Sequence, residues 1–270
     1  MHDRISVMQV VSLYRHPIKS FPAEPCDALE IDTNGRVTGD RVLGFRFDDA
    51  GPPNDVKWRR KTWFASLQHT PALALLRCGY DSATRRAWIK FLDSDELVEG
   101  SIDEPGDRLR FEHHLNRWYA ELDGTPFAMG RRKLPLRLVG NGTDGRFHDT
   151  SAGLTTLHSR ESLSDLAKAA GMSAISELRF RSNIAIEGCD PWEEFGWIGR
   201  KIRIGEVDFK VRKTVVRCLA THVDPASGAR DIDVMGTLTR IIGQDEPQFA
   251  VSLKAQNSGT IRIGDEVAVM

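Results

Sequence analysis

The stretch KIRIGEVDFKVRKTVVRCLATHVDPASG, residues 201–228, combines a strong strand signal with an unusual cysteine. Apolar and polar residues alternate on both sides of Gly205-Glu206, which predicts a β-hairpin with its turn at these two residues. Cys218 follows the β-branched end of this run. A lone cysteine is most often a small buried apolar side chain, whereas a reactive one needs exposure and an electropositive setting. Position alone leaves both interpretations of Cys218 open, with burial the commoner case.

The size and charge of the chain narrow the classes of function. It has 270 residues, enough for one large domain or two ordinary ones. With 37 basic against 38 acidic residues, the formal net charge is −1. No overall field attracts nucleic acid or an anionic membrane, so neither is an expected partner. A site that binds an anion would therefore need basic residues gathered at that site.

The four cysteines lie far apart, at positions 26, 78, 189 and 218. No CxxC pair is present, so neither a zinc site nor an iron–sulfur cluster is indicated. Cys26, Cys78 and Cys189 are expected to be structural, in a reducing compartment. The N-terminal apolar stretch is too short for a signal peptide, and no run reaches the length of a membrane span. We therefore expect a soluble, cytoplasmic protein.

Short strand-like segments bounded by Gly, Pro, Asn and Asp dominate the chain, which predicts a mainly β fold with few helices, of the α+β class. Hairpins are predicted at 73–92 and 260–269. One helix is predicted in SRESLSDLAKAAG, 159–171, with Ser159 as its cap and Gly171 at its end. The Pro-, Gly- and Arg-rich segment 125–135 is the best candidate for a domain boundary.

Two segments could bind an anion. In RFRSNIAIE, 179–187, strand alternation would place Arg179, Arg181 and Asn183 on one face. Arginine suits bidentate phosphate or carboxylate contacts, although a solvated outer face is the commoner explanation. In HPIKS, 16–20, Pro17 directs Lys19 and Ser20 into a turn, where they could either meet an anion or be solvated.

Other polar residues carry weaker signals. Asp40-Arg41 is expected to be a surface ion pair. The segment HDTSAGLTTLHSRESL, 148–163, offers small hydroxyls and carboxylates before the predicted helix, and His158 in it is expected to be structural. No GxSxG elbow, P-loop or GxGxxG is present, so hydrolase, nucleotide-triphosphatase and dinucleotide-binding functions gain no support.

Together these segments resemble a known family. KTVVRCLATHVDPASG, 213–228, and NSGTIRIGDEVAVM, 257–270, resemble the MOSC domain, named for the C-terminus of molybdenum cofactor sulfurases. VSLYRHPIKS and TGDRVLGFRF resemble the N-terminal β-barrel domain of the amidoxime-reducing component family and its bacterial relatives. RFRSNIAIEGCDPWEEFGWIGRKIRIGEVDFKV resembles the segment that leads into the cysteine. The resemblance implies an N-terminal β-barrel domain over 1–128 and a MOSC β-barrel domain over 129–270.

The resemblance also implies a molybdenum cofactor (molybdopterin with its molybdenum), and not pyridoxal phosphate. By motif match, Cys218 would be the protein thiolate on molybdenum, which suits a soft metal. A protonated Asp149 is a candidate for assisting departure of the substrate oxygen. Residues matched to cofactor binding are Lys19, Ser20, Arg41, Thr150, Ser151, Arg181, Asn183 and Arg217, the last being adjacent to the cysteine.

The predicted function is a molybdenum-dependent oxidoreductase that reduces N-hydroxylated or N-oxygenated small molecules. Because the chain ends at Met270 after the last expected strand, electrons are expected from a separate donor protein of ferredoxin, flavoprotein or cytochrome type. Three alternatives remain: sulfur transfer through a persulfide on Cys218, a carrier of the cofactor without turnover, and a β-barrel binding module in which Cys218 is buried.

Overall fold

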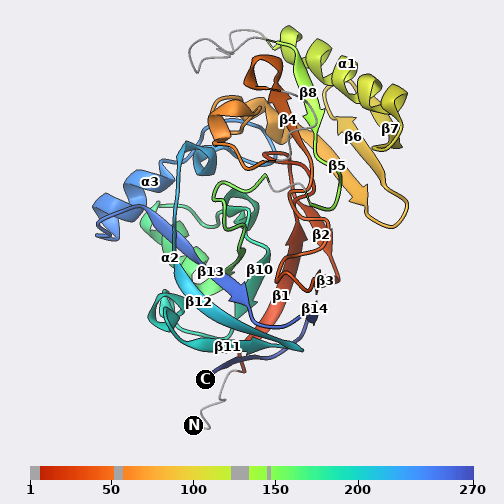
Figure 1. The fold of residues 1–270 in the computed structure, drawn as a ribbon. Helices are drawn as coiled ribbons and strands as arrows, with labels where there is room; N and C mark the ends of the chain where they lie inside the picture. The colour runs from red at the N-terminus through yellow and green to blue at the C-terminus, as the bar shows by residue number, and fades with distance from the viewer. Residues whose placement is uncertain (1–6, 52–56, 123–133, 145–146) are drawn as a thin grey trace, which may run out of the picture.

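The computed structural model describes residues 7–51, 57–122, 134–144 and 147–270 (Figure 1). These residues form fifteen strands in four sheets together with three α-helices, which confirms the predicted mainly β, α+β class. In the described part of the chain, no helix has the length and apolar character needed to cross a bilayer.

The largest sheet has eight strands, in which all neighbours are antiparallel except β9 and β10. Near its ends, Val10 N donates to Asp265 O and Val267 N donates to Met8 O, each at 2.9 Å. These bonds link β1 to the segment that enters β15, but the strand order itself is open, so the closed barrels expected from sequence are not confirmed. The order is β15 (Val267–Val269), β11 (Lys201–Ile204), β12 (Val207–Val216), β13 (Gln248–Ala255), β9 (Thr155–Ser159), β10 (Ile184–Glu187), β1 (Gln9–Arg15) and β2 (Glu24–Cys26).

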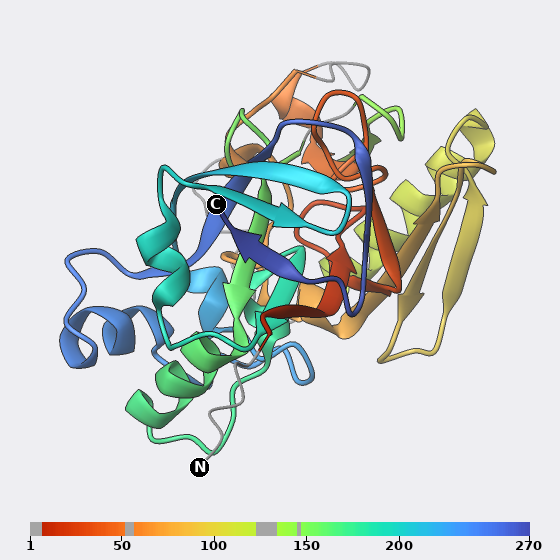
Figure 2. The ribbon, with the colours of Figure 1, turned by 90° about the horizontal axis from the view of Figure 1, so that it is seen from below.

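Three smaller sheets complete the β structure. Two of them are pairs: β3 (Ala28–Ile31) with β14 (Gly259–Arg262), and β4 (Gly44–Phe47) with β8 (Leu136–Val139). The third is a meander of β5 (Leu76–Asp81), β6 (Arg86–Phe91) and β7 (Leu97–Ser101). Seen from below, this meander and the long helix beside it lie at one side of the molecule, away from the eight-stranded sheet (Figure 2).

The predicted helix is present as α2 (Arg160–Ala169). Ser159 Oγ accepts a hydrogen bond from Ser162 N at 3.1 Å, and Gly171 follows the helix in the left-handed region with φ +71°. Both are the end signals on which the prediction depended. A second helix, α3, is short (Val234–Gly236).

The long helix α1 (Pro105–Glu121) was not predicted from sequence. Its signals are visible in retrospect: Pro105 stands at the first helical position, and Phe111, Leu115 and Trp118 recur at helical spacing on its buried face. The one helix predicted from sequence lies in the C-terminal part of the chain, and α1 adds a helix to the N-terminal part, within the predicted class of few helices.

The hairpins at 73–92 and around Gly205-Glu206 are confirmed as β5–β6 and β11–β12. The hairpin predicted at 260–269 is wrong, because β14 pairs with β3 and β15 pairs with β11. The residues between them still form a turn, in which Asp265 N donates to Arg262 O at 3.1 Å, but the two strands do not pair with each other. Instead, Ile263 N donates to Asp27 O at 3.2 Å and Gly264 N donates to Val10 O at 2.8 Å, so this segment bonds to distant strands.

Two apolar cores of different composition support the sheets. One is built entirely from residues between 18 and 138, and the other combines residues 10–37 with residues 157–267. Strands β1, β2 and β3 therefore belong to the same sheets and core as the C-terminal strands. The boundary predicted at 128/129, like most of segment 125–135, lies outside the described residues, and the division into two domains there stays a prediction.

Candidate functional site

A cavity of about 660 Å³ lies where the N-terminal loops meet the ends of β12 and β13. Nine of the ten site residues predicted from sequence line it, although they come from five separate segments of the chain. Asn183 is the exception. The nine are Lys19, Ser20, Arg41, Asp149, Thr150, Ser151, Arg181, Arg217 and Cys218.

Cys218 lies two residues after the end of β12, at the start of a 3-10 turn formed by Leu219–His222. Its carbonyl accepts hydrogen bonds from Thr221 N at 2.9 Å and from Thr221 Oγ1 at 3.0 Å, which fix the backbone. The residue is half-buried, and in the described part of the chain its Sγ forms no hydrogen bond with protein. The thiol is thus free to meet a ligand.

The three other cysteines do not line the cavity. Burial raises the pKa of Cys78 and of Cys189 to about 12, and it also raises the pKa of Cys26. A thiolate is therefore disfavoured at all three positions.

Arg217 holds the strand that carries the cysteine. Its backbone N–H donates to Pro247 O at 2.7 Å, its Nε donates to Phe249 O at 2.7 Å and its Nη1 donates to Phe180 O at 2.8 Å. A second donor, Nη2, also contacts Phe249 O. No carboxylate pairs with this guanidinium among the described residues, and burial lowers the pKa of Arg217 to about 9. Arg217 thus lines the cavity and at the same time donates hydrogen bonds to backbone carbonyls.

Lys19 and Asp149 form an ion pair on the cavity wall. Lys19 Nζ lies 2.6 Å from Asp149 Oδ1 and donates to Phe147 O at 2.7 Å. Burial lowers the pKa of Lys19, while Asp149 opposes that shift. Although burial acts against ionisation of Asp149, the Lys19 ammonium holds its pKa well below the usual range. The pair works against Asp149 as a proton donor near neutral pH, because the carboxylate is already ionised.

Arg41 and Arg181 lie next to each other in the cavity. Arg41 Nη2 donates to Arg181 O at 2.9 Å, and Arg181 Nη1 donates to Phe21 O. Burial, reinforced by the neighbouring Arg41, lowers the pKa of Arg181 to about 10. Asp149 and Asp40 oppose this shift, but Arg181 forms no ion pair among the described residues, and an anionic ligand would supply a direct counter-charge.

Ser20, Arg41 and Arg181 also share an uncommon backbone conformation. Their φ angles are +67°, +51° and +52°, in the left-handed region that side chains other than glycine rarely adopt. Such residues cost free energy and concentrate at functional sites. Three residues of this kind on one cavity wall indicate that the loops are shaped for what the cavity binds.

The strand predicted over 179–187 begins only at Ile184, so the predicted polar row of side chains is wrong. Arg181 in its left-handed conformation interrupts the alternation. Asn183 is fully buried; its Nδ2 donates to Tyr14 O at 3.1 Å and its Oδ1 accepts from Thr156 N at 3.2 Å, which joins β1 to β9. Its predicted contact with a cofactor is not seen in the cavity lining.

Arg179 lies in the 3-10 turn before Arg181 and is also buried. Its Nη2 contacts Asp231 Oδ2 at 2.7 Å and lies 3.6 Å from Asp224 Oδ1, and its Nη1 donates to His222 O at 3.1 Å. All three partners belong to the loop that follows Cys218. Arg179 therefore anchors the cysteine loop from the cavity wall.

The cavity as a whole is cationic. Seven lining residues are Lys or Arg and two are Asp or Glu, so the wall carries a surplus of positive charge although the whole chain does not. Sequence reasoning missed Lys61 and Lys213 on this wall, since lone lysines are ordinary in any sequence. In the described ranges, no cluster of three or more His, Cys, Asp or Glu side chains could hold a metal ion. Cys218 is thus the soft ligand that the cavity offers.

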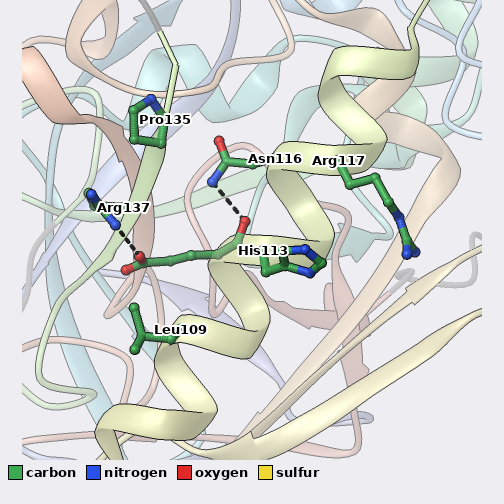
Figure 3. A pocket seen from close by; sticks show the side chains of 7 residues that line it. Leu109, His113, Asn116, Arg117, Pro135 and Arg137 are labelled. Carbon is green, nitrogen blue, oxygen red and sulfur yellow. Dashed lines mark hydrogen bonds and ion pairs between the residues drawn. The ribbon is translucent and has the colours of Figure 1, made fainter.

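A second cavity, of about 580 Å³, lies between α1 and β8 (Figure 3). The side chains of Glu112, Asn116 and Arg137 in it are already paired. Arg137 Nη1 lies 3.0 Å from Glu112 Oε2, and Asn116 Nδ2 donates to Glu112 O at 2.7 Å, as Figure 3 shows. Glu112 Oε1 also accepts from Leu138 N at 3.0 Å. These bonds attach the helix to the strand and leave the cavity without an evident chemical role.

Comparison with known proteins finds a family similarity that covers part of the chain. Residues 144–268 match the MOSC domain. A molybdenum cofactor sulfurase from Oryza sativa subsp. japonica is 23% identical over 97% of this chain, and mitochondrial amidoxime-reducing component 1 from Mus musculus is 34% identical over 36% of it. The matched regions span about a third of each relative, 33% and 31%.

Among solved structures, the YuaD protein from Bacillus subtilis aligns with a TM-score of 0.41 at 14% identity. The alignment covers 97% of this chain and 95% of that one.

Proposed function

We propose that this chain, whose residues 144–268 match the MOSC domain, binds the molybdenum cofactor and uses it to reduce N-oxygenated small molecules. The observation that carries the proposal is the joint presence in one cavity of an unpaired cysteine thiol and of two arginines, Arg181 and Arg217, that contact backbone carbonyls and form no ion pair among the described residues. The relatives named as amidoxime-reducing component and as molybdenum cofactor sulfurase support a function connected with this cofactor.

The residues of the cavity fit the group. Cys218 offers the thiolate that a soft metal prefers. Arg181 and Arg41 offer guanidinium groups for a dianionic phosphate, and the exposed hydroxyls of Thr150 and Ser151 offer further donors. When bound, the cofactor supplies the two-electron redox chemistry. The electrons would come from a separate donor protein.

The chain itself would bind, orient and supply protons. Reduction of an N–OH group to N–H consumes two electrons and two protons and releases water. The Lys19–Asp149 pair can hold an exchangeable proton in the cavity, and that proton resides on Lys19 Nζ because Asp149 is ionised. Arg217 and Arg179 would keep the cysteine loop in place through their contacts with backbone and carboxylates.

Sulfur transfer through a persulfide on Cys218 is the second candidate. It is favoured by the relative from Oryza sativa, a molybdenum cofactor sulfurase that aligns with nearly the whole chain. A persulfide needs an accessible thiol, which the half-buried Cys218 provides, but it does not need the cationic wall.

The test is to measure molybdenum and pterin per chain after expression in a host that makes the cofactor. Wild type is compared with Cys218→Ala and Arg181→Ala, and Cys189→Ala is the matched control because it removes a thiol outside the cavity. Near-stoichiometric molybdenum that is lost in the first two variants and retained in the control supports the proposal. A wild type without molybdenum or pterin contradicts it, and a persulfide on Cys218 that survives Arg181→Ala would establish sulfur transfer instead.

Activity then separates an enzyme from a carrier. A loaded wild-type protein should oxidise a chemically reduced viologen dye when an N-hydroxylated amidine is added. Bound cofactor without turnover of any N-oxygenated compound would identify a carrier.

A further inference from the structure

The carboxylate of Asp40 is buried where three segments of the cavity wall converge. The residue is 5% exposed, although its sequence context predicted a surface ion pair. Oδ1 accepts a hydrogen bond from His16 N at 2.7 Å, and Oδ2 accepts from Arg41 Nη1 at 2.5 Å. His148 Nε2 lies 3.3 Å from the same Oδ2. One carboxylate thus contacts the start of the HPIKS turn, Arg41, and the segment that carries Asp149.

These contacts leave Arg41 little freedom. Its Nη1 is held by Asp40 and its Nη2 by Arg181 O, so the two ends of the guanidinium are fixed by different segments. Its backbone is fixed as well, because Arg41 N donates to His16 O at 2.7 Å and Phe147 N donates to Arg41 O at 2.9 Å. A side chain held in this way loses little conformational entropy when it binds a ligand.

The charge of Asp40 is as important as its position. Burial acts against its ionisation, but Arg41, His148 and His16 together hold its pKa well below the usual range. An ionised Asp40 partly balances the cations of the wall before any ligand arrives. Asp40 therefore gives Arg41 a direct counter-charge on the part of the wall that it shares with Arg181.

We propose that Asp40 is the positioning residue of an anion site in this cavity: it orients Arg41 for a phosphate group and locks the loops of Lys19 and Asp149 around it. Asp40 faces away from the ligand and acts through Arg41. The proposal rests on the proposed function for the identity of the ligand. The anion site itself requires only the geometry of the wall.

The experiment measures binding of inorganic phosphate to protein produced in a host that does not make the cofactor. Wild type, Asp40→Asn, Arg41→Ala and the double variant are titrated calorimetrically, and their far-UV circular dichroism and unfolding midpoints are recorded. Asn keeps the size of Asp40 but places an amide donor opposite Arg41 or His148. Asp208→Asn is the matched control, because Asp208 also pairs with an arginine, at 2.6 Å from Arg203 Nε, but this ion pair is exposed.

We expect Asp40→Asn to weaken phosphate binding at least tenfold, Arg41→Ala to weaken it by a similar factor, and Asp208→Asn to change it less than twofold. If Asp40 acts through Arg41, adding Asp40→Asn to Arg41→Ala should weaken binding less than twofold further. If Asp40 had a merely structural role, Asp40→Asn would weaken phosphate binding by the same factor in wild type and in Arg41→Ala. That result overturns the proposal.

Two further outcomes are decisive. Unchanged phosphate affinity in Asp40→Asn refutes the positioning role, and a wild type that does not bind phosphate refutes the anion site. If Asp40→Asn does not fold, the same cycle is run with Asp40→Glu, which keeps the charge but moves the carboxylate by one methylene. Because the readout needs no molybdenum, failure of the proposed function and failure of this inference give different results.

Discussion

The fully buried His16 makes a quantitative prediction about stability in acid. Its side chain is enclosed beside Asp40, with Nδ1 at 3.6 Å from Asp40 Oδ1. Burial and the nearby charges of Arg181 and Arg41 lower the pKa of His16 to about 3, although Asp40 opposes the shift. His16 is therefore neutral in the folded protein at every pH at which the protein would normally be handled.

The sign of the effect follows from proton linkage. Above pH 6.5, His16 is neutral in both the folded and the unfolded chain, and it makes no difference to stability. Below about pH 6.5, His16 becomes protonated in the unfolded chain but stays neutral in the folded chain. The free energy of unfolding therefore falls as the pH falls. The loss is about 1.4 kcal/mol for each pH unit. Between pH 6.5 and 5.0 it amounts to about 2 kcal/mol, a large part of a typical stability.

The assay is urea unfolding of wild type and His16→Asn at pH 7.5 and pH 5.0. Asparagine cannot titrate, so wild type should lose about 2 kcal/mol more than the variant on acidification. Other groups, including the buried His148, whose pKa is also lowered by burial, contribute equally to both proteins. His113→Asn, at an exposed position of α1, should follow the wild type. Equal losses in wild type and His16→Asn would show that His16 is not held neutral, and the reasoning would fail.

Three other predictions test the core and the cysteine. Cys218 should react with a thiol reagent in the native protein at least tenfold faster than Cys78, which is buried with its pKa raised to about 12; equal rates would contradict the assignment of the exposed thiol. Phe249→Ala should lower the free energy of unfolding in urea by about 3–5 kcal/mol, because the ring is fully buried, and a loss below 1 kcal/mol would mean that the site collapses around it. Gly140→Ala should cost about 2 kcal/mol or more, since φ is +109° and a Cβ would lie 2.2 Å from Val42 O; an unchanged midpoint would refute the close approach.

Sequence reasoning succeeded where the signal was local. The capped helix α2 and the hairpins β5–β6 and β11–β12 depend on turn residues and on periodicity within about twenty residues. It failed where the partner was distant. The segment 260–269 has the turn residues of a hairpin, but β14 pairs with β3 and β15 pairs with β11. A local pattern states which face of a strand is apolar and does not state which strand it pairs with.

The candidate site shows the same division. Cys218 could be noticed from its place after a β-branched run, and the cavity lining includes nearly all residues matched through family resemblance. The buried role of Asp40 could not be found, because an Asp-Arg dipeptide looks the same on a surface and in a core. The prediction that Arg179, Arg181 and Asn183 share one face of a strand was wrong because a residue in the left-handed conformation breaks strand alternation. Glycine is the residue type that signals this conformation in a sequence, and an arginine does not.

The way the cations are held explains why the cavity favours an anionic ligand. Lys19 donates to Phe147 O, Arg41 donates to Arg181 O, and Arg181 donates to Phe21 O, so each cation from one part of the chain contacts a carbonyl from another. Carbonyl oxygens satisfy N–H groups but do not cancel charge. Because Asp40 and Asp149 balance only part of the surplus, an anion that enters the cavity both binds and joins the loops of the two halves. Ligand binding and folding stability would therefore be linked at this site, and phosphate should raise the unfolding temperature further with each increase in its concentration above Kd, as the logarithm of that concentration.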